Sequence, residues 1–492
     1  MSVKEINEFL KNNKIDIPFE VILVTGTNGK TSTSHLINLF LLRFFKILGI
    51  DLKVGLFSKP HILKINERIK INYIDIDDNS LNYFSKKVNE LKGSINLNWF
   101  DELVLVTILY FLKNNIDVSI FEIGIGGRYD STNALNSIIN VITNIGLEHI
   151  DILGNSIKSI AYQKSGIIKD NSFTLTYANK GFKTIYNQAL KKNSFILNLN
   201  HLFKIKLIDI SLNDNYEFNK NNYQFNFKFV YFIKLLNNVK LINNLNAKIF
   251  KDFKNSKKIF FSLYKVLRIS FKDILIIEFY NPYLIKNYLI AFVSSLLFLI
   301  LNGYEGLVIK NLDEIKSVFI NLSREFDLAG RFNIFKINNS FVLIDSAKDV
   351  VALEYILKLF FNKLYKMISN SLLNDLEISI VLSFSKGKDF SRFKNIYNIL
   401  YRNSDKIKNI YFLEHLVEAK SEKSDIIFEE FYKNLVKISN NDYKILSKLK
   451  NLSKLDENKI IEILKENKFI FITGSIYFVA NIIDIIKEKI FI

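Results

Sequence analysis

The chain has 492 residues, a formal net charge of +18 and no cysteine. The length predicts two or three domains of about 150 residues each. The lack of cysteine excludes disulfide scaffolds, thiolate metal sites and cysteine nucleophiles. With 49% hydrophobic residues and only 3 prolines, the composition is that of a folded globular protein. The positive charge favours anionic partners, although Lys, Asn, Ile and Phe are abundant along the whole chain, so much of the excess is compositional bias.

The first residues of the chain and its most apolar run indicate where in the cell the protein is expected. Residues 1–20 have no basic-then-apolar block of the kind that marks a leader. The most apolar run, residues 288–301, is shorter than the about 20 residues that a membrane span needs, and it predicts a buried helix. We therefore expect a soluble, cytoplasmic protein without a membrane partner.

The first third of the chain alternates strands and helices. Residues 20–24 form an apolar run that ends at a Gly-containing turn, and apolar residues recur at helical spacing over 33–48. Two more apolar runs, 118–123 and 140–145, are each followed by glycine. This alternation predicts a parallel sheet with its ligands at the carboxyl ends of the strands.

Later segments predict a second domain. Residues 195–275, rich in Asn, Lys and Phe, predict a low-complexity, β-containing excursion with a strand near 223–232, and a helix-rich segment follows. New strands are expected at 341–344, 378–384 and 469–472. The predicted fold class is α/β, with a mostly parallel, P-loop-type ATPase domain over 1–327 and a smaller Rossmann-like domain over 328–492.

The strongest local motif is T-G-T-N-G-K-T-S at residues 25–32, between a strand and a helix. Backbone N–H groups in such a turn, together with the helix N-terminus, bind phosphate oxygens. Lys30 can neutralise the β- and γ-phosphates, and the Thr31 hydroxyl can bind Mg²⁺. Val24 stands where the standard phosphate loop has its first glycine. An ordinary β-turn-α connection is therefore the alternative.

Three further polar residues follow predicted strands or end a helix. Glu122 closes an apolar strand, where a carboxylate is costly unless it is paired or binds a metal, and a salt bridge to Arg128 is the alternative. Gly124 and Gly126 could begin a dinucleotide fingerprint, but its third glycine would have to be at position 129. Tyr129 stands there, which argues against NAD binding. His149 could bind Mg²⁺ or be purely structural, and Lys164 alone is typical of a solvated charge at a helix end.

Taken together, these strings resemble the Mur ligase superfamily, specifically its folylpolyglutamate synthase and dihydrofolate synthase family. The resemblance covers the whole chain except about 195–275. It rests on the order of several rare strings: T-G-T-N-G-K-T-S at 25–32, K-P-H-I at 59–62, N-E-R-I at 66–69, the stretches 122–133 and 142–169, A-G-R-F at 329–332 and T-G-S-I-Y at 473–477.

The resemblance implies an ATP-dependent amide ligase. A folate or dihydropteroate carboxylate would attack the γ-phosphate of ATP to give an acyl phosphate, and the amine of L-glutamate would then displace phosphate. It also implies two Mg²⁺ ions, a carbamylated Lys164 and, as a further candidate, a monovalent cation. The expected partners are small molecules rather than nucleic acid, and the expected state is a monomer.

The resemblance also assigns residues. The catalytic residues would be Lys30, His149 and Lys164. ATP would be bound by Gly26, Thr27, Asn28, Gly29, Lys30, Thr31, Asn287, Arg331 and Asp345. The metal ligands would be Thr31, Glu122 and His149. Folate would be bound by Pro60, His61, Asp130 and Thr132. The glutamate side would hold Lys348 and Ser475.

The sequence departs from the family's strings in places. Lys348 replaces a histidine, Lys59 replaces a serine, and Tyr283 and Leu284 replace a His-Gln pair before Asn287. The ATP half is therefore better preserved than the glutamate half. A degenerate protein that binds nucleotide or folate without ligation is the main alternative. A nucleic-acid-binding protein, supported only by the charge, and a Mur-type ligase acting on cell-wall nucleotides are the others.

Overall fold

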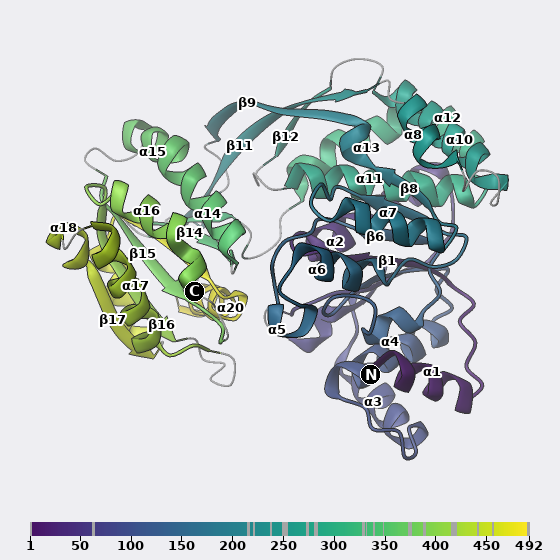
Figure 1. Ribbon diagram of the computed structural model, residues 1–492, viewed down its shortest axis with the longest axis horizontal. Helices are drawn as coiled ribbons and strands as arrows, with labels where there is room; N and C mark the ends of the chain where they lie inside the picture. Colours follow the sequence, from purple (N-terminus) through teal and green to yellow (C-terminus); the bar gives the residue numbers. More distant parts are fainter. Residues whose placement is uncertain are drawn as a thin grey trace. The chain divides into compact units, whose positions relative to one another are not determined.

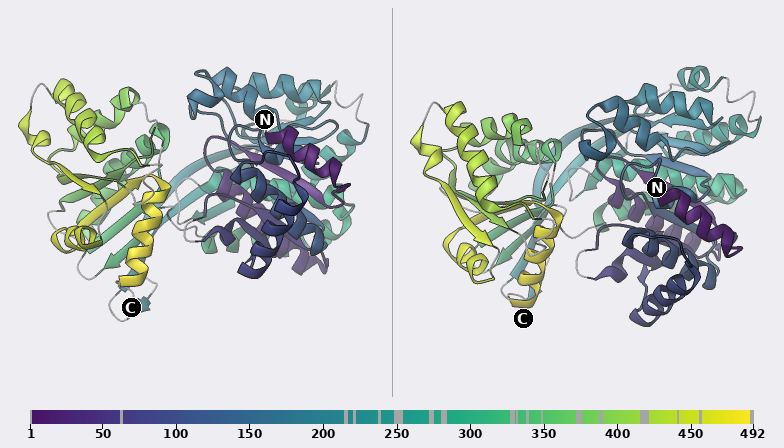
Figure 2. Two further views of the ribbon diagram at one scale, coloured as in Figure 1. Left: turned by 90° about the horizontal axis from the view of Figure 1, so that it is seen from below. Right: turned by 60° about the horizontal axis from the view of Figure 1, so that its bottom comes forward.

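A computed structural model describes residues 2–489 except for 62–63, 214–216, 220–221, 237–238, 248–253, 272–274, 280–283, 327–329, 331, 338–339, 348, 372–375, 387–389, 415–420, 440–441 and 455–456. The chain forms two compact units (Figures 1 and 2). The first unit comprises Met1–Ile208, Val230–Phe279 and Tyr283–Phe326. The second comprises Asp209–Phe229, Tyr280–Pro282 and Asp327–Ile492.

The first unit is built on an eight-stranded sheet, among the residues described, with the order β4-β3-β2-β5-β1-β6-β7-β8. Its strands are β1 (Glu20–Thr25), β2 (Val54–Phe57), β3 (Ile69–Ile71), β4 (Ile74–Asp75), β5 (Val118–Glu122), β6 (Ile139–Ile142), β7 (Phe173–Thr176) and β8 (Phe195–Asn198). The six strands from β2 to β8 in this order pair in parallel, whereas β3 and β4 are antiparallel additions at one edge.

The sequence explains this arrangement. The central parallel strands are short and buried along nearly their whole length, as expected for strands covered on both faces. The predicted strands at 20–24, 118–123 and 140–145 correspond to β1, β5 and β6, and the predicted α/β class is confirmed. Strands β1, β5 and β6 are neighbours, so the segments that follow them meet at one edge of the sheet.

Helices cover both faces of this sheet (Figure 1). They are α1 (Ser2–Asn12), α2 (Lys30–Leu48), η1 (Ile65–Arg68), α3 (Asp78–Leu91), α4 (Trp99–Lys113), η2 (Ser131–Ala134), α5 (Ile150–Leu153), α6 (Ile157–Ser165), α7 (Phe182–Lys191), η3 (Leu199–His201), α8 (Val239–Leu245), α10 (Lys254–Ser270), α11 (Leu284–Leu301), α12 (Glu305–Lys310) and α13 (Leu312–Glu325).

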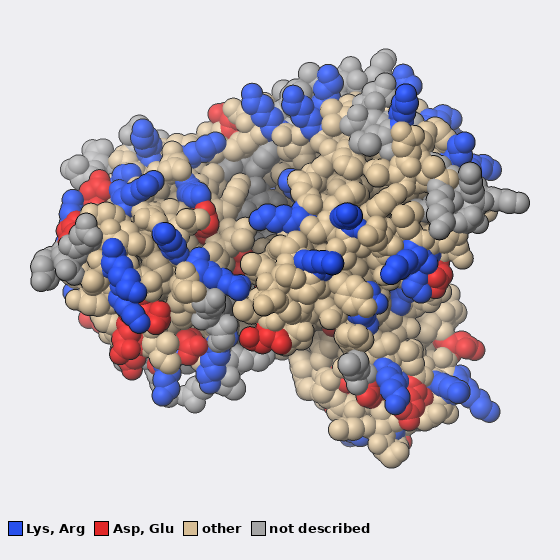
Figure 3. Space-filling view, viewed as in Figure 1, with Lys and Arg blue, Asp and Glu red and all other residues tan. Residues whose placement is uncertain are grey.

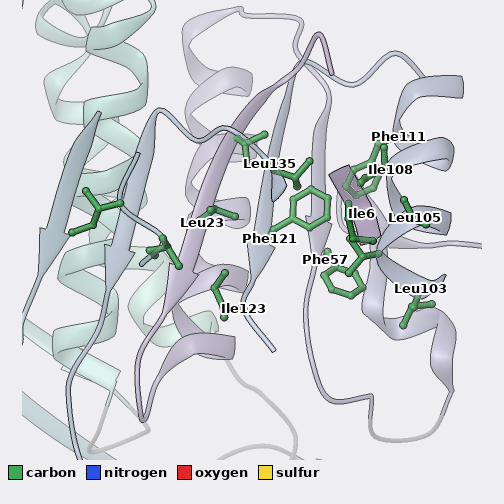
Figure 4. Packing of buried hydrophobic residues seen from close by; sticks show 14 of the residues in the cluster. Ile6, Leu23, Phe57, Leu103, Leu105, Ile108, Phe111, Phe121, Ile123 and Leu135 are labelled. Carbon is green, nitrogen blue, oxygen red and sulfur yellow. The ribbon is translucent and has the colours of Figure 1, made fainter. Parts of the chain in front are cut away.

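One face of the sheet packs against α1, α3 and α4 through a continuous apolar core (Figure 4). Phe121 of β5 lies at its centre, with ring centroids 5.6 Å from Phe57 and 5.8 Å from Phe111. The Asn98 side chain caps α4 by accepting hydrogen bonds from the backbone N–H groups of Phe100 and Asp101, which fixes where this covering helix begins.

The opposite face packs against α2 and α11. Phe40 of α2 lies 5.0 Å from the Tyr288 ring and 5.5 Å from the Phe292 ring of α11. Helix α11 is long and apolar enough to cross a membrane by length and composition, but 83% of its 18-residue window is buried within the protein. The predicted buried helix at 288–301 is therefore confirmed as a core helix.

The other sheet has the path β10-β11-β13-β14-β18-β15-β16-β17. Most of it lies in the second unit, whereas Leu275–Phe279 belongs to the first unit and the strands over 203–213 and 222–235 are divided between the two units. The strands of this sheet include β10 (Glu217–Asn219), β11 (Asn222–Leu235), β13 (Asn333–Ile337), β14 (Ser340–Asp345), β15 (Ile378–Ser383), β16 (Ile407–Glu414), β17 (Leu449–Lys454) and β18 (Phe469–Gly474), and off this path β9 (Phe203–Asn213) and β12 (Leu275–Phe279) pair with β11. The helices of the second unit are α14 (Val350–Leu359), the π-helix η4 (Phe360–Leu364), α15 (Tyr365–Ser371), η5 (Phe390–Phe393), α16 (Lys394–Arg402), α17 (Ser424–Ser439), α18 (Tyr443–Leu446), α19 (Glu457–Glu466) and α20 (Ile476–Lys489). Strands predicted at 341–344, 378–384 and 469–472 are confirmed as β14, β15 and β18.

The segment 195–275 has more structure than the sequence predicted. The strand expected near 223–232 lies within β11, but the segment also contains the helices α8 and α10. Residues 222–225 of β11 pair antiparallel with β13. The segment Asp209–Phe229 therefore lies with the second unit, which differs from the expectation that all of 1–327 forms one domain.

On the face seen in Figure 3, Lys and Arg side chains are spread over the whole surface, and acidic side chains are sparse in its upper part. A nucleic-acid interface would need basic groups gathered on one face or along one helix. This view therefore offers no support for the nucleic-acid alternative.

The packing of Phe292 yields a stability prediction. Its side chain is 1% exposed, and its ring lies 4.6 Å from Phe319. We expect Phe292→Ala to lower the free energy of unfolding of the first unit by about 3–5 kcal/mol, because it leaves a cavity between helices. Urea unfolding followed by the fluorescence of Trp99, the chain's single tryptophan, measures this change.

The matched control is Tyr83→Ala, at a side chain that is 61% exposed. It should cost about 1 kcal/mol or less. Equal destabilisation by the two variants would contradict the packing described for α11.

Candidate active site

The loop between β1 and α2, residues 25–31, is held in a fixed shape by close contacts. A Cβ on Gly26 would lie 1.8 Å from Thr143 Oγ1, and one on Gly29, whose φ is +84°, would lie 2.3 Å from Asn287 Oδ1. Only glycine fits at these two positions. Asn287, a predicted ATP-binding residue, lies beside this loop at the start of α11, and its contact with ATP stays a prediction.

Hydrogen bonds join the loop to the segment after β6. The N–H of Thr27 donates to Asn144 O at 3.0 Å, and the N–H of Asn28 donates to Asn144 Oδ1 at 2.8 Å. The Thr143 hydroxyl donates to Asn28 O at 2.6 Å. These bonds fix the shape of the loop, while the turn into α2 that follows, residues 29–31, offers backbone N–H groups of the kind that bind phosphate.

Lys30 begins α2 and turns back over the loop. Its Nζ donates to Gly26 O at 2.7 Å and lies 3.3 Å from Thr27 O. The ammonium is thereby held above the backbone that would carry a phosphate chain. The predicted neutralisation of the β- and γ-phosphates by Lys30 stays a prediction.

Glu122 lies at the end of β5, directly beside the loop. Thr31 Oγ1 is 3.0 Å from Glu122 Oε1 and 2.8 Å from the carbonyl oxygen of Lys59. The N–H of Lys59 donates to Glu122 Oε2 at 3.0 Å. Burial raises the pKa of Glu122, against the positive charges of Lys30 and Lys59, which lower it.

The alternative for Glu122 was a salt bridge to Arg128. In the structure, Arg128 contacts Tyr162 instead. Arg128 Nη2 donates to Tyr162 O at 3.2 Å, and its guanidinium stacks 3.9 Å from the Tyr162 ring centroid. The carboxylate of Glu122 is instead held by Thr31 and Lys59.

Lys164, on α6, is 1% exposed and points back to the same loop. Its Nζ donates to Gly26 O at 2.8 Å and forms an ion pair with Glu148 Oε1 at 2.6 Å. It is therefore not a solvated charge at a helix end. Burial alone would raise the pKa of Glu148, but the charges of Lys30 and Lys164 hold that pKa at about 2.

Glu148 is the residue that the sequence analysis missed. It lies directly before His149, in the segment after β6, and so belongs to the same short sequence string that singled out His149. The acidic side chain was passed over in favour of its neighbour, although a buried lysine at the site needs an anionic partner.

His149 is exposed and adopts the left-handed conformation, with a φ of 44°, at the start of α5. The described part of the chain contains no group of three or more His, Cys, Asp or Glu side chains able to hold a metal ion. Of the predicted ligand set, the structure brings Thr31 and Glu122 into direct contact, and the place of His149 in the set stays a prediction.

Thr31 and Glu122 fit a magnesium site of the type that protein and nucleotide share. Mg²⁺ is commonly held by one or two carboxylates together with substrate phosphates, rather than by a complete protein cage. A hydroxyl and a buried carboxylate 3.0 Å apart, beside a phosphate-type loop, supply that donor set. Lys164, as an ammonium, supplies no metal ligand.

The predicted folate residues form two groups. Asp130 accepts hydrogen bonds from Ile125 N at 2.8 Å and from the Thr132 hydroxyl at 2.6 Å, so these side chains shape the loop after β5. His61 Nδ1 accepts from Arg68 Nε at 2.9 Å, next to Pro60. The contacts of these four residues with a folate stay predictions.

Two of the predicted residues in the second unit are described. Asp345 is buried at the end of β14, paired in register with Thr473 of β18. Ser475 is buried, its N–H donates to Ser383 O at 2.7 Å, and its hydroxyl lies 3.0 Å from Ser385 Oγ. Arg331 and Lys348 lie outside the described residues.

Comparison with known proteins shows what part of the chain is similar to. Residues 24–249 match the Mur ligase middle domain. The chain is 37% identical over 175 residues to dihydrofolate synthase/folylpolyglutamate synthase of Haemophilus influenzae, covering 36% of this chain and 38% of that protein. It is 33% identical over 190 residues to the enzyme of the same name from Buchnera aphidicola, covering 37% and 42%. These alignments span about two fifths of the length of the relatives.

Solved structures extend the likeness of fold to nearly the whole chain. Escherichia coli FolC in complex with DHPP and ADP has a TM-score of 0.68 at 18% identity, covering 99% of this chain and 93% of that one. A bifunctional folylpolyglutamate synthase/dihydrofolate synthase with Mn, AMPPNP and L-glutamate bound has a TM-score of 0.66 at 18% identity, covering 99% and 94%.

Residues 24–249, which include the phosphate-type loop, thus match a Mur ligase middle domain. The relatives that it matches over about two fifths of their length bear the name dihydrofolate synthase/folylpolyglutamate synthase, and the solved structures share its fold.

The Lys164–Glu148 pair yields a prediction about pH. Because the folded-state pKa of Glu148 is about 2, below the unfolded value of 4.5, the pair stabilises the fold above pH 4.5 and that stability is lost as the pH falls towards 2. The difference corresponds to about 3 kcal/mol. Glu148→Gln should therefore be less stable at neutral pH and should lose less stability on acidification.

Urea midpoints across this pH range, read by Trp99 fluorescence, measure the effect. The control is Glu8→Gln, at an exposed carboxylate on α1, which should follow the wild-type protein. A wild-type pH dependence in Glu148→Gln would contradict the ion pair.

Proposed function

We propose that this protein is an ATP-dependent ligase that joins L-glutamate to the carboxylate of a folate or of dihydropteroate. The observation that carries the proposal is the convergence of Lys30, Lys164 and the Thr31–Glu122 pair on the 25–31 loop. The names of the relatives, dihydrofolate synthase/folylpolyglutamate synthase, support the substrate class.

The chemistry needs an activated acyl donor, because a free carboxylate has no good leaving group. Its oxygen attacks the γ-phosphorus of ATP, the bond to the β-phosphate oxygen breaks, and ADP leaves with that electron pair. The glutamate amine then attacks the acyl carbon of the acyl phosphate, inorganic phosphate leaves, and the amine loses a proton as the amide forms. Both steps bring anions together, so they need fixed positive charge.

The chain supplies much of that charge itself. In the proposal, the N–H groups of the loop and the Lys30 ammonium hold the β- and γ-phosphates. Thr31 and Glu122 would hold a divalent ion, which adds positive charge to the transferring phosphoryl group. In its amine form, Lys164 keeps Gly26 O, and with it the loop, in place through its hydrogen bond.

Two finer parts of the proposal concern Lys164 and the ions. We propose that Lys164 carries a carbamate in the working enzyme, beside a second Mg²⁺ ion that His149 would help to hold, with a monovalent cation as a further candidate. In its amine form Lys164 is paired with Glu148, so carbamylation requires that pair to open. The protein would act as a monomer in the cytoplasm.

The alternative is a nucleotide- or folate-binding protein without ligase activity. The observation that favours it is Lys59, whose backbone and side chain lie against Glu122 and Gly124. Folate-dependent ADP release without an amide product would support this alternative.

The test of the proposed function is product analysis by mass spectrometry. Purified protein is given ATP, Mg²⁺, glutamate and either dihydropteroate or tetrahydrofolate. We expect addition of one glutamate to the first acceptor, chain extension on the second, or both. No ADP release above background with either acceptor would refute ligation.

Variants locate the reaction at the proposed site. Lys30→Ala and His149→Ala should each lower kcat by at least about 100-fold, because each removes a group proposed to stabilise the transferring phosphoryl group or its ion. Circular dichroism should show both variants folded. The matched control is Lys86→Ala, at an exposed lysine on α3, which should keep wild-type turnover. Full activity in both site variants would show that the site lies elsewhere.

The modification of Lys164 is tested by the mass of the intact protein. Protein prepared with bicarbonate should carry an added mass of one carbon dioxide, which Lys164→Arg should lack. An unmodified mass under turnover conditions would refute the carbamate and leave the amine paired with Glu148.

A further inference from the structure

Lys59 is the cation at this site whose position the proposed reaction does not explain. It follows β2, and its backbone is held from both sides: its N–H donates to Glu122 Oε2 at 3.0 Å, and its carbonyl lies 2.8 Å from Thr31 Oγ1. The residue is thus fixed between the same two groups that would hold a divalent ion.

The side chain of Lys59 stays at the site rather than extending into solvent. Its Nζ donates a hydrogen bond to the carbonyl oxygen of Gly124, two residues beyond Glu122. Lys59 as a whole is half-buried. A lysine held at both its backbone and its ammonium keeps a fixed positive charge beside Glu122.

The electrostatic consequence is visible at Glu122. Burial raises the pKa of this carboxyl, while Lys30 first and then Lys59 act in the opposite direction through their charges. The carboxylate is therefore partly neutralised by the chain itself. A divalent ion approaching the nucleotide-free site meets two positive charges and a carboxylate already compensated by them.

We propose that Lys59 is a built-in counter-ion of Glu122 that lowers the affinity of the nucleotide-free site for divalent cations, so that the ion enters together with the nucleotide. The phosphates of a nucleotide add several negative charges at the loop and restore the attraction for the ion. This inference rests on the proposed nucleotide binding for its second half, whereas its first half concerns the free protein alone.

The experiment measures binding of Mn²⁺ alone to the nucleotide-free protein, by electron paramagnetic resonance of the unbound ion. We expect Lys59→Met, which keeps the length of the side chain and removes its charge, to bind Mn²⁺ about tenfold more tightly than the wild-type protein. Lys59→Gln provides a second neutral variant if Lys59→Met does not fold. The matched control is Lys64→Gln, an exposed lysine five residues further along the chain, which should bind like the wild type.

A double variant shows where the gain arises. Adding Glu122→Gln to Lys59→Met should abolish the tighter binding, because the gain depends on that carboxylate. Mn²⁺ affinity in both neutral variants equal to that of the wild type would overturn the proposal. Tighter binding that persists in the double variant would also overturn it, since the ion would then lie elsewhere.

Nucleotide binding is measured separately with a fluorescent ATP analogue. The wild-type protein should bind Mn²⁺ more tightly when ATP is present, and this enhancement should be smaller in Lys59→Met. If the wild-type protein binds no nucleotide, the proposed function fails, while the Mn²⁺ titration of the free protein still decides the role of Lys59.

Discussion

The site depends on a buried carboxylate at the end of a central strand. Glu122 is 1% exposed at the end of β5, where an uncompensated charge would cost several kcal/mol. Its hydrogen bonds come from two segments: the Thr31 hydroxyl donates to Oε1 and the N–H of Lys59 donates to Oε2. The loop after β1 and the loop after β2 are thereby joined through one acidic side chain.

The same principle extends to the third segment. Lys164, buried on α6, and Glu148, after β6, compensate each other next to Gly26. Two carboxyl groups and three lysines thus lie around one glycine-containing turn, and the positive charges of these lysines act to lower the pKa values of both carboxyls. Moving Lys164 or Glu148 would leave a buried charge without its partner, so this pair helps to fix the loop in one conformation.

Much of this could be predicted from the sequence, since strand ends are local signals. The T-G-T-N-G-K-T-S string after an apolar run located Lys30 and Thr31, and the same reasoning located Glu122. Glu148 was missed because its importance follows from the burial of Lys164, which depends on how α6 packs and is not visible in a local string. Asp130 was chosen from a family string, whereas in the structure its carboxylate holds the loop through Ile125 N.

The segment 195–275 was the hardest to predict, because its pairing is non-local. The alternation over 223–232 correctly indicated a strand, but the partner of residues 222–225 is β13, about a hundred residues later in the chain. No periodicity within the segment specifies such a partner. The residue preferences of the segment therefore indicate a strand, but they do not specify the sheet to which the strand belongs.

The pairing of β11 with β13 has a consequence for dividing the protein. Strand β13 has β14 on one side and β11 on the other, so a fragment starting at residue 327 would contain β13 with one row of backbone donors and acceptors open. Exposed edges of this kind recruit other chains into mixed sheets and aggregates. A soluble version of the C-terminal half would need residues 209–229 grafted back as a covering strand, and during synthesis that strand emerges from the ribosome long before the sheet it completes.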